Sequence, residues 1–104
     1  MNTNKVEQIY EAIEKIQGML SNKTYSMSRI EAIYSVVSDI IHDAEFYYYN
    51  LPPKLQCSIK GKYTRDVLFA MRNVCECLEA IEADDSLSYK RAMLEDALEY
   101  LKEI

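Results

Sequence analysis

The sequence has very few residues that break helices or form tight turns. Only two glycines and two prolines occur among its 104 residues. A β-rich fold needs such residues at short intervals, so their scarcity argues against one. The helix-favouring residues Ile, Leu, Ala, Glu and Lys are plentiful instead. The composition therefore predicts an all-α protein.

Long apolar runs are also missing. The most apolar stretch, AIYSVVSDII at residues 32–41, contains two serines and an aspartate and falls short of the roughly 18 residues of a membrane span. The first residues, MNTNKVEQ, lack the basic-then-apolar layout of a signal peptide. A hydrophobic fraction of 49% excludes a disordered chain. We expect one domain over residues 1–104, located in the cytoplasm, with no membrane contact.

Cysteine is present only three times, at Cys57, Cys75 and Cys77. The number is odd and no CxxC spacing occurs, so neither a disulfide framework nor a zinc motif is indicated. On a helix, Cys75 and Cys77 diverge by about 200° and cannot hold one ion together. We predict reduced thiols that pack, and no metal site.

Residues typical of catalysis are scarce as well. His42 is the single histidine, and nothing in the sequence fixes a cysteine beside it as a nucleophile. Two glycines cannot supply a glycine-rich phosphate loop. Asp84 and Asp85 fit helix capping better than acid–base chemistry. We therefore expect a protein without enzymatic activity and without a cofactor.

One short motif resembles part of an enzyme signature. Arg72-Asn73-Val74, within an expected helix, is similar to the arginine–asparagine part of the signature of helical HEPN ribonucleases. Cys77 stands where that signature has histidine. The ribonuclease activity that the resemblance implies therefore lacks its histidine in this chain.

Charge is unevenly distributed along the sequence. The net charge is −5, yet residues 51–75 carry +4, between −3 over residues 1–50 and −6 over residues 76–104. An acidic whole argues against a general nucleic-acid binder, because phosphates attract positive charge. The basic segment at residues 54–72 leaves binding of an anion, a nucleotide or a nucleic acid as the alternative function. Its candidate residues are Lys54, Lys60, Lys62, Arg65 and Arg72.

Apolar residues recur at alternating intervals of three and four, which is the pattern of amphipathic helices. Four helices with short connections favour an antiparallel up-down four-helix bundle. The third helix is expected to kink or break near Gly61, with Thr64 starting a fresh segment. The expected helices cover residues 4–20, 28–49, 53–81 and 86–101. The core face of the first is expected to hold Val6, Ile9, Ile13, Ile16 and Leu20, that of the third Val67, Leu68, Met71, Val74, Cys75, Leu78 and Ile81, and that of the fourth Leu87, Leu94, Ala97, Leu98 and Leu101.

The stretch EFYYYNLPP, at residues 45–53, holds more rings than one helix face can bury. Measured from Val37 at the centre of the expected core face, Tyr47 and Tyr48 lie on or beside that face. Phe46 points about 180° away and Tyr49 about 120° away. His42 precedes Phe46 by one turn and shares its side. These three residues form a stripe on the outer face of the second helix.

A similar stripe is expected on the third helix. Phe69 points about 200° away from Val67, with Arg65 and Arg72 one turn to either side. The rings could simply cover a neighbouring helix or loop. Aromatic residues and arginine are also the types enriched at binding hot spots. The candidate partner-binding residues are His42, Phe46, Tyr49, Arg65, Phe69 and Arg72.

We therefore predict a small protein that works by binding another protein, either a second copy in a homo-oligomer such as a dimer or a target that it inhibits. In size and expected architecture it is similar to bacteriocin immunity proteins, and its small size and acidity are similar to those of phage inhibitors of bacterial defence. Anion binding through the basic segment is the alternative, and an enzyme is a distant third.

Overall fold

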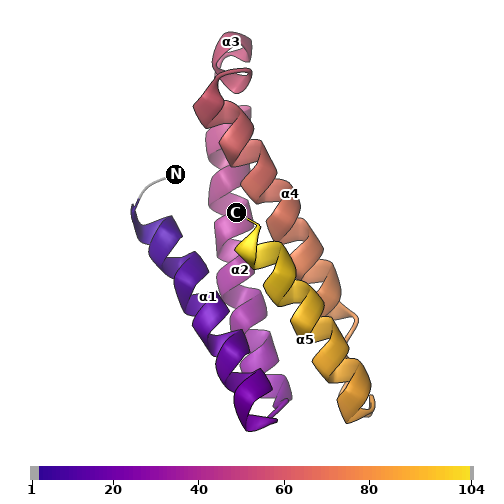
Figure 1. Cartoon of the computed structure of the whole chain (residues 1–104). Coiled ribbons are helices and arrows are strands. Elements are labelled where there is room, and N and C mark those ends of the chain that lie inside the picture. The colour runs from indigo at the N-terminus through magenta and orange to yellow at the C-terminus, as the bar shows by residue number, and fades with distance from the viewer. Residues whose placement is uncertain (1–2, 104) are drawn as a thin grey trace.

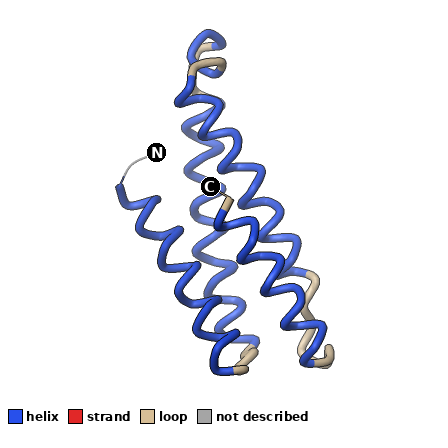
Figure 2. The backbone as a smooth tube through the Cα atoms, viewed as in Figure 1, coloured by secondary structure: helices blue, strands red, loops and turns tan. Residues whose placement is uncertain are grey.

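The computed structural model describes residues 3–103, with side chains from residue 6 onward. Within this range the chain forms five helices and no strand, as Figures 1 and 2 show. The prediction of an all-α protein is confirmed for these residues. The helices are α1 (Thr3–Asn22), α2 (Met27–Tyr49), α3 (Pro53–Gln56), α4 (Ile59–Glu79) and α5 (Leu87–Lys102).

The four long helices lie lengthwise against one another around a single core (Figure 1). Helix α2 packs against α1 and α4, and α5 packs against the same two helices. The molecule is elongated, with extents of 47 × 22 × 20 Å. Its centre consists of side chains with no exposed surface, including Ile16, Val37, Met71, Val74 and Leu94.

The buried face of α4 matches the predicted stripe. Val67, Leu68, Met71, Val74 and Leu78 are all buried, as the spacing of three and four residues requires. This stripe packs between α2 and α5. The predicted core face of the third helix is therefore confirmed.

The predicted face of α1 is wrong in three positions, the first of which is Val6, at 37% exposed. Ile13 and Leu20 are only half-buried, whereas Ala12 and Met19 are buried together with Ile16. The spacing of three and four residues is kept, but the helix is rotated on its axis. Because α1 packs against both α2 and α5, its most buried arc lies between these neighbours and not at the centre of its apolar stripe.

The beginning of α5 departs from its predicted pattern too. Leu87, expected in the core, is 66% exposed, because it is the first residue of the helix. Lys90 is buried instead, and its Nζ donates a hydrogen bond of 2.9 Å to the carbonyl of Ala83 in the preceding loop. The long aliphatic stem covers the core while the charged end ties down the loop.

The third predicted helix is divided, but the break precedes Gly61. Helix α3 ends at Gln56, and Ser58 caps α4 by accepting a hydrogen bond of 3.1 Å from the Gly61 N–H. A Cβ atom on Gly61 would lie 2.5 Å from the Gln56 carbonyl oxygen and closer still to that of Leu55. Gly61 is therefore where α4 crosses closely over the backbone of α3.

The expectation that Thr64 begins a new segment is wrong. Thr64 lies inside α4 with no exposed surface, and its hydroxyl donates a hydrogen bond of 2.9 Å to the Lys60 carbonyl. This back-bond satisfies the hydroxyl without interrupting the helix. A threonine inside a helix and a threonine at its start look alike in the sequence.

Among the described residues, no helix combines the length and apolar character needed to cross a membrane. Helix α2 is the most apolar of the long helices, and it fails this requirement because serines and charged residues are spread along it.

Candidate binding surface

One end of the molecule consists of α3 and the helix ends that flank it. We call residues 46–63, from the last turn of α2 to the first turn of α4, the tip. In Figure 1 the tip stands beyond the beginning of α1 and the end of α5. Helix α3 packs against α4, at the end of the molecule that α1 and α5 do not reach. Six of the eleven exposed large apolar side chains of the described residues belong to the tip: Phe46, Tyr47, Tyr49, Leu55, Ile59 and Tyr63.

The predicted stripe on α2 lies where this helix enters the tip. His42, Phe46 and Tyr49 line one shallow hollow together with Glu45 and Asn50. Phe46 is 74% exposed and Tyr49 is 61% exposed, so the prediction that both rings lie outside the core is confirmed. Asn50 closes the helix end by donating from Nδ2 to the Phe46 carbonyl over 2.6 Å.

The other two rings of the run divide differently from the prediction. Tyr48 is half-buried, and its ring meets Tyr49 edge-on with the ring centroids 5.4 Å apart. Tyr47, predicted on or beside the core face, is 37% exposed. Because the end of α2 lies in the tip, beyond the ends of α1 and α5, a core-facing position there has less to pack against.

The structure separates the predicted stripe of α4 into two places. Arg72 reaches toward α2, where its Nη2 lies 3.6 Å from Oε1 of Glu45, the neighbour of Phe46. Phe69 is 52% exposed and opens into a different hollow between α4 and α5, beside Tyr100. Arg72 therefore joins the stripe of α2, whereas Phe69 does not line the same hollow. Arg65 is exposed, and its Nε lies 3.9 Å from Oδ1 of the adjacent Asp66.

Leu55 and Ile59 are binding candidates that the sequence did not single out. Ile59 is 91% exposed and Leu55 is 50% exposed. Ile59 is the first residue of α4, directly after the capping Ser58. A serine three residues before Gly61 is a recognisable helix-start signal, and it could have placed Ile59 outside the core.

The tip is basic in a protein that is acidic overall. Lys54, Lys60 and Lys62 are exposed, and residues 46–63 contain no aspartate or glutamate. Two other candidates for anion binding, Arg65 and Arg72, lie beside carboxylates. Of the five basic residues, the three lysines are the ones that belong to the tip.

Three ionisable groups between the helices have raised pKa values. The Tyr34 hydroxyl donates a 2.6 Å hydrogen bond to Oε1 of Glu79, and this bond and the nearby negative charge raise the tyrosine pKa. Burial raises the pKa of the Cys75 thiol. Burial also raises the pKa of the Cys77 thiol, and the nearby carboxylates of Asp96 and Glu76 raise it further. Both thiols are therefore held in the neutral form, which is a poor nucleophile and a poor metal ligand.

The loop between α4 and α5 contains a group of carboxylates. Oxygen atoms of Glu82, Asp84 and Asp85 lie within 4.8 Å of one another. Oδ2 of Asp85 accepts a hydrogen bond of 2.7 Å from the Glu82 N–H, so this side chain caps the turn. Ser86 caps α5 by accepting from the Tyr89 N–H over 3.2 Å. These contacts are those of a structured turn.

No protein-family model, curated protein or solved structure matches the chain.

The Arg72-Asn73-Val74 motif lies within α4, where its three residues point in different directions. Arg72 faces Glu45 on α2, Asn73 lines the hollow between α4 and α5, and Val74 is fully buried.

Proposed function

We propose that this protein acts by binding another protein through its tip, without catalysis. The observation that carries the proposal is that four exposed apolar side chains, Phe46, Tyr49, Leu55 and Ile59, all belong to the one end that stands beyond α1 and α5. Isolated exposed apolar residues are ordinary, but a cluster of them is typical of an interaction site. Aromatic rings of this kind are frequent anchors in protein interfaces.

The scaffold that presents the tip is proposed to be a single antiparallel up-down four-helix bundle with α3 as a short connecting helix. Two observations support it. The long helices contact one another in the closed order α1, α2, α4, α5, and the colour gradient in Figure 1 runs in alternating directions along them.

The location in which the protein works is proposed to be the cytoplasm, where its three free cysteines stay reduced.

The partner that we test first is a second copy of the chain, which would form a dimer. The alternative protein partner is a target that is inhibited by being covered. Inhibition is favoured by the likeness in size and architecture to bacteriocin immunity proteins and by the likeness in size and acidity to phage inhibitors. The exposed apolar tip is compatible with a dimer and with an inhibited target alike. In either case Phe46 and Ile59 are the proposed anchors, with His42, Tyr49 and Arg72 around them.

A second candidate function is favoured by the charge of the tip. Lys54, Lys60 and Lys62 would attract a phosphate-bearing ligand, and Tyr49 could stack on a base. The two functions differ in their response to salt. Phosphate contacts weaken steeply as the salt concentration rises, whereas apolar protein contacts do not.

The proposal is tested with Phe46→Ser and Ile59→Ser, measured by thermal melting and by sedimentation velocity. Because both side chains are exposed, each variant should melt within a few degrees of the parent, since surface changes stay within about 0.5 kcal/mol. Loss of one anchor should weaken self-association by about 2 kcal/mol, or roughly thirtyfold in the dissociation constant. Leu87→Ser is the matched control, because Leu87 is exposed to a similar degree but lies at the start of α5.

If the parent is monomeric, the parent and its Phe46→Ser, Ile59→Ser and Leu87→Ser variants are used as baits for quantitative affinity capture. A partner retained by the parent and by Leu87→Ser, but lost with Phe46→Ser, supports inhibition of a target. Phe69→Ser tests whether the hollow between α4 and α5 belongs to the same surface. Equal binding by the parent and both tip variants would exclude the tip as the binding surface.

A further inference from the structure

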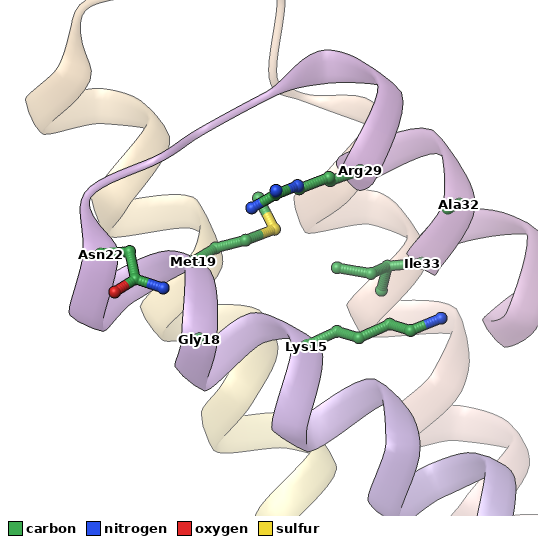
Figure 3. Close-up of a pocket in the computed structure, with 7 residues that line it drawn as sticks. All are labelled: Lys15, Gly18, Met19, Asn22, Arg29, Ala32 and Ile33. Carbon is green, nitrogen blue, oxygen red and sulfur yellow. The ribbon is translucent and has the colours of Figure 1, made fainter.

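A pocket lies between α1 and α2, and it is separate from the tip. Figure 3 shows its wall: Lys15, Gly18, Met19 and Asn22 from α1, and Arg29, Ala32 and Ile33 from α2. The volume is about 360 Å³, at the small end of the range of ligand pockets. The proposed function uses none of these residues.

Two of the residues that line the pocket, one on each helix, are small. Gly18 has no side chain, and a Cβ built on it would meet nothing within 4 Å. Ala32, on α2, carries only a methyl group. Met19 and Ile33, both buried, supply the apolar interior between them. In Figure 3 both side chains extend from their own helix toward the other one.

The two charged residues that line the pocket are both cationic. Lys15 and Arg29 contribute a cation from each helix, and no carboxylate lines the pocket. Lys15 Nζ lies 3.0 Å from Oε1 of Glu11, one turn back on α1, and both side chains are exposed. Arg29 uses Nη1 for a hydrogen bond of 3.3 Å to the Thr24 hydroxyl. The remaining guanidinium donors of Arg29 are left for an anion, and a guanidinium binds a carboxylate through paired hydrogen bonds.

We propose that this pocket binds a small amphipathic anion, with an apolar tail against Met19 and Ile33 and a carboxylate at Arg29. The apolar interior selects the tail, and the cations on both helices select the negative head. Lys15, which is paired with Glu11, adds a second positive charge on α1. The ligand class is a short-chain carboxylate, whose size fits a volume of about 360 Å³.

The probe is sodium octanoate, titrated into the ¹⁵N-labelled full chain and followed by NMR. We expect saturable shifts of amides in residues 15–22 and 29–33, and much weaker shifts with 1-octanol, which has the same tail and no charge. Arg29→Gln should weaken octanoate binding about tenfold, because a hydrogen bond to a charged group is lost. Binding of octanol as tight as that of octanoate would overturn the assignment of an anion.

The location is tested by filling the pocket. Gly18→Leu places a side chain in the open space and should abolish binding while the protein stays folded, since leucine favours a helix more than glycine does. Ala32→Leu fills the same space from α2 and serves as the second variant. Gln17→Leu is the matched control, because Gln17 is exposed, neighbours Gly18 and does not line the pocket. No saturable shift in the parent, or undiminished binding by both filled variants, would refute the proposal.

Discussion

The two glycines of this protein both lie in helices, and the same substitution should have opposite effects at the two positions. Gly18 is near the C-terminal end of α1, four residues before Asn22, and Gly61 is in the first turn of α4. Neither has a positive φ angle, so alanine fits the backbone conformation at both. The difference lies in the space around the added methyl group.

At Gly18 the methyl group meets no other atom within 4 Å. Only the gain in helix propensity remains, so Gly18→Ala should stabilise the protein by about 0.5–1 kcal/mol. At Gly61 the methyl group would lie 2.5 Å from the Gln56 carbonyl oxygen, with the Leu55 carbonyl closer still. These are backbone atoms, and the Leu55 carbonyl already accepts a hydrogen bond of 3.1 Å from the Ser58 N–H. Relief therefore requires α3 to move, and overpacking of this kind costs about 1–3 kcal/mol.

The assay is thermal unfolding of both alanine variants and the parent, followed by far-UV circular dichroism. One kcal/mol shifts the melting temperature of a domain of this size by about 4–8 °C. Gly18→Ala should therefore melt a few degrees above the parent, and Gly61→Ala clearly below it. If Gly61→Ala proved as stable as Gly18→Ala, the close crossing of α4 over α3 would be refuted.

Three further predictions test the core, the thiols and one bond between α2 and α4. Val37→Asp buries an unpaired charge where no surface is exposed, so it should unfold the protein or lower its melting temperature severely. At pH 8, a thiol reagent should modify exposed Cys57 rapidly and Cys75 slowly, because burial shields Cys75 and raises its pKa; equal native rates would contradict its burial. The hydrogen bond to Glu79 raises the Tyr34 pKa, so it stabilises the fold below the ordinary tyrosine pKa of about 10 and is lost as pH rises through the folded value. The melting temperature of the parent should therefore fall as the pH is raised through this value, and that of Tyr34→Phe should fall less. An equal fall in both proteins would mean that another group causes it.

The helices were predictable because their signals are local. Spacings of three and four, the proline pair before α3 and the serine before α5 need no knowledge of the rest of the chain. The rotation of α1 was not predictable in the same way. Ile13 and Ala12 are both apolar, and the choice between them depends on where α2 and α5 lie around α1.

The candidate surface was predicted in part, for a similar reason. A helical wheel places Phe46 and Phe69 outside the core, and their exposure agrees. A wheel has no information on which helices are neighbours, so it could not show that Phe46 shares a hollow with Tyr49 while Phe69 opens toward α5. Nor could it show that α3 stands beyond α1 and α5, which is what makes Ile59 so exposed.

The construction of the tip bears directly on how it could bind. Exposed apolar side chains on a flexible loop would lose conformational freedom on binding, which weakens affinity. Here they are carried by three helices joined through tight contacts: Ser58 caps α4, Gly61 lets α4 cross closely over α3, and Nε2 of Gln56 donates to the carbonyls of Tyr48 and Leu51 over 3.2 and 3.1 Å. The last of these contacts fastens α3 back onto the end of α2. Gln56→Ala should therefore weaken partner binding although Gln56 is no proposed anchor, because it loosens the frame that presents Phe46 and Ile59. Unchanged binding by a Gln56→Ala variant with a measurably looser α3, seen as faster amide hydrogen exchange there, would show that rigidity of the tip contributes nothing to affinity.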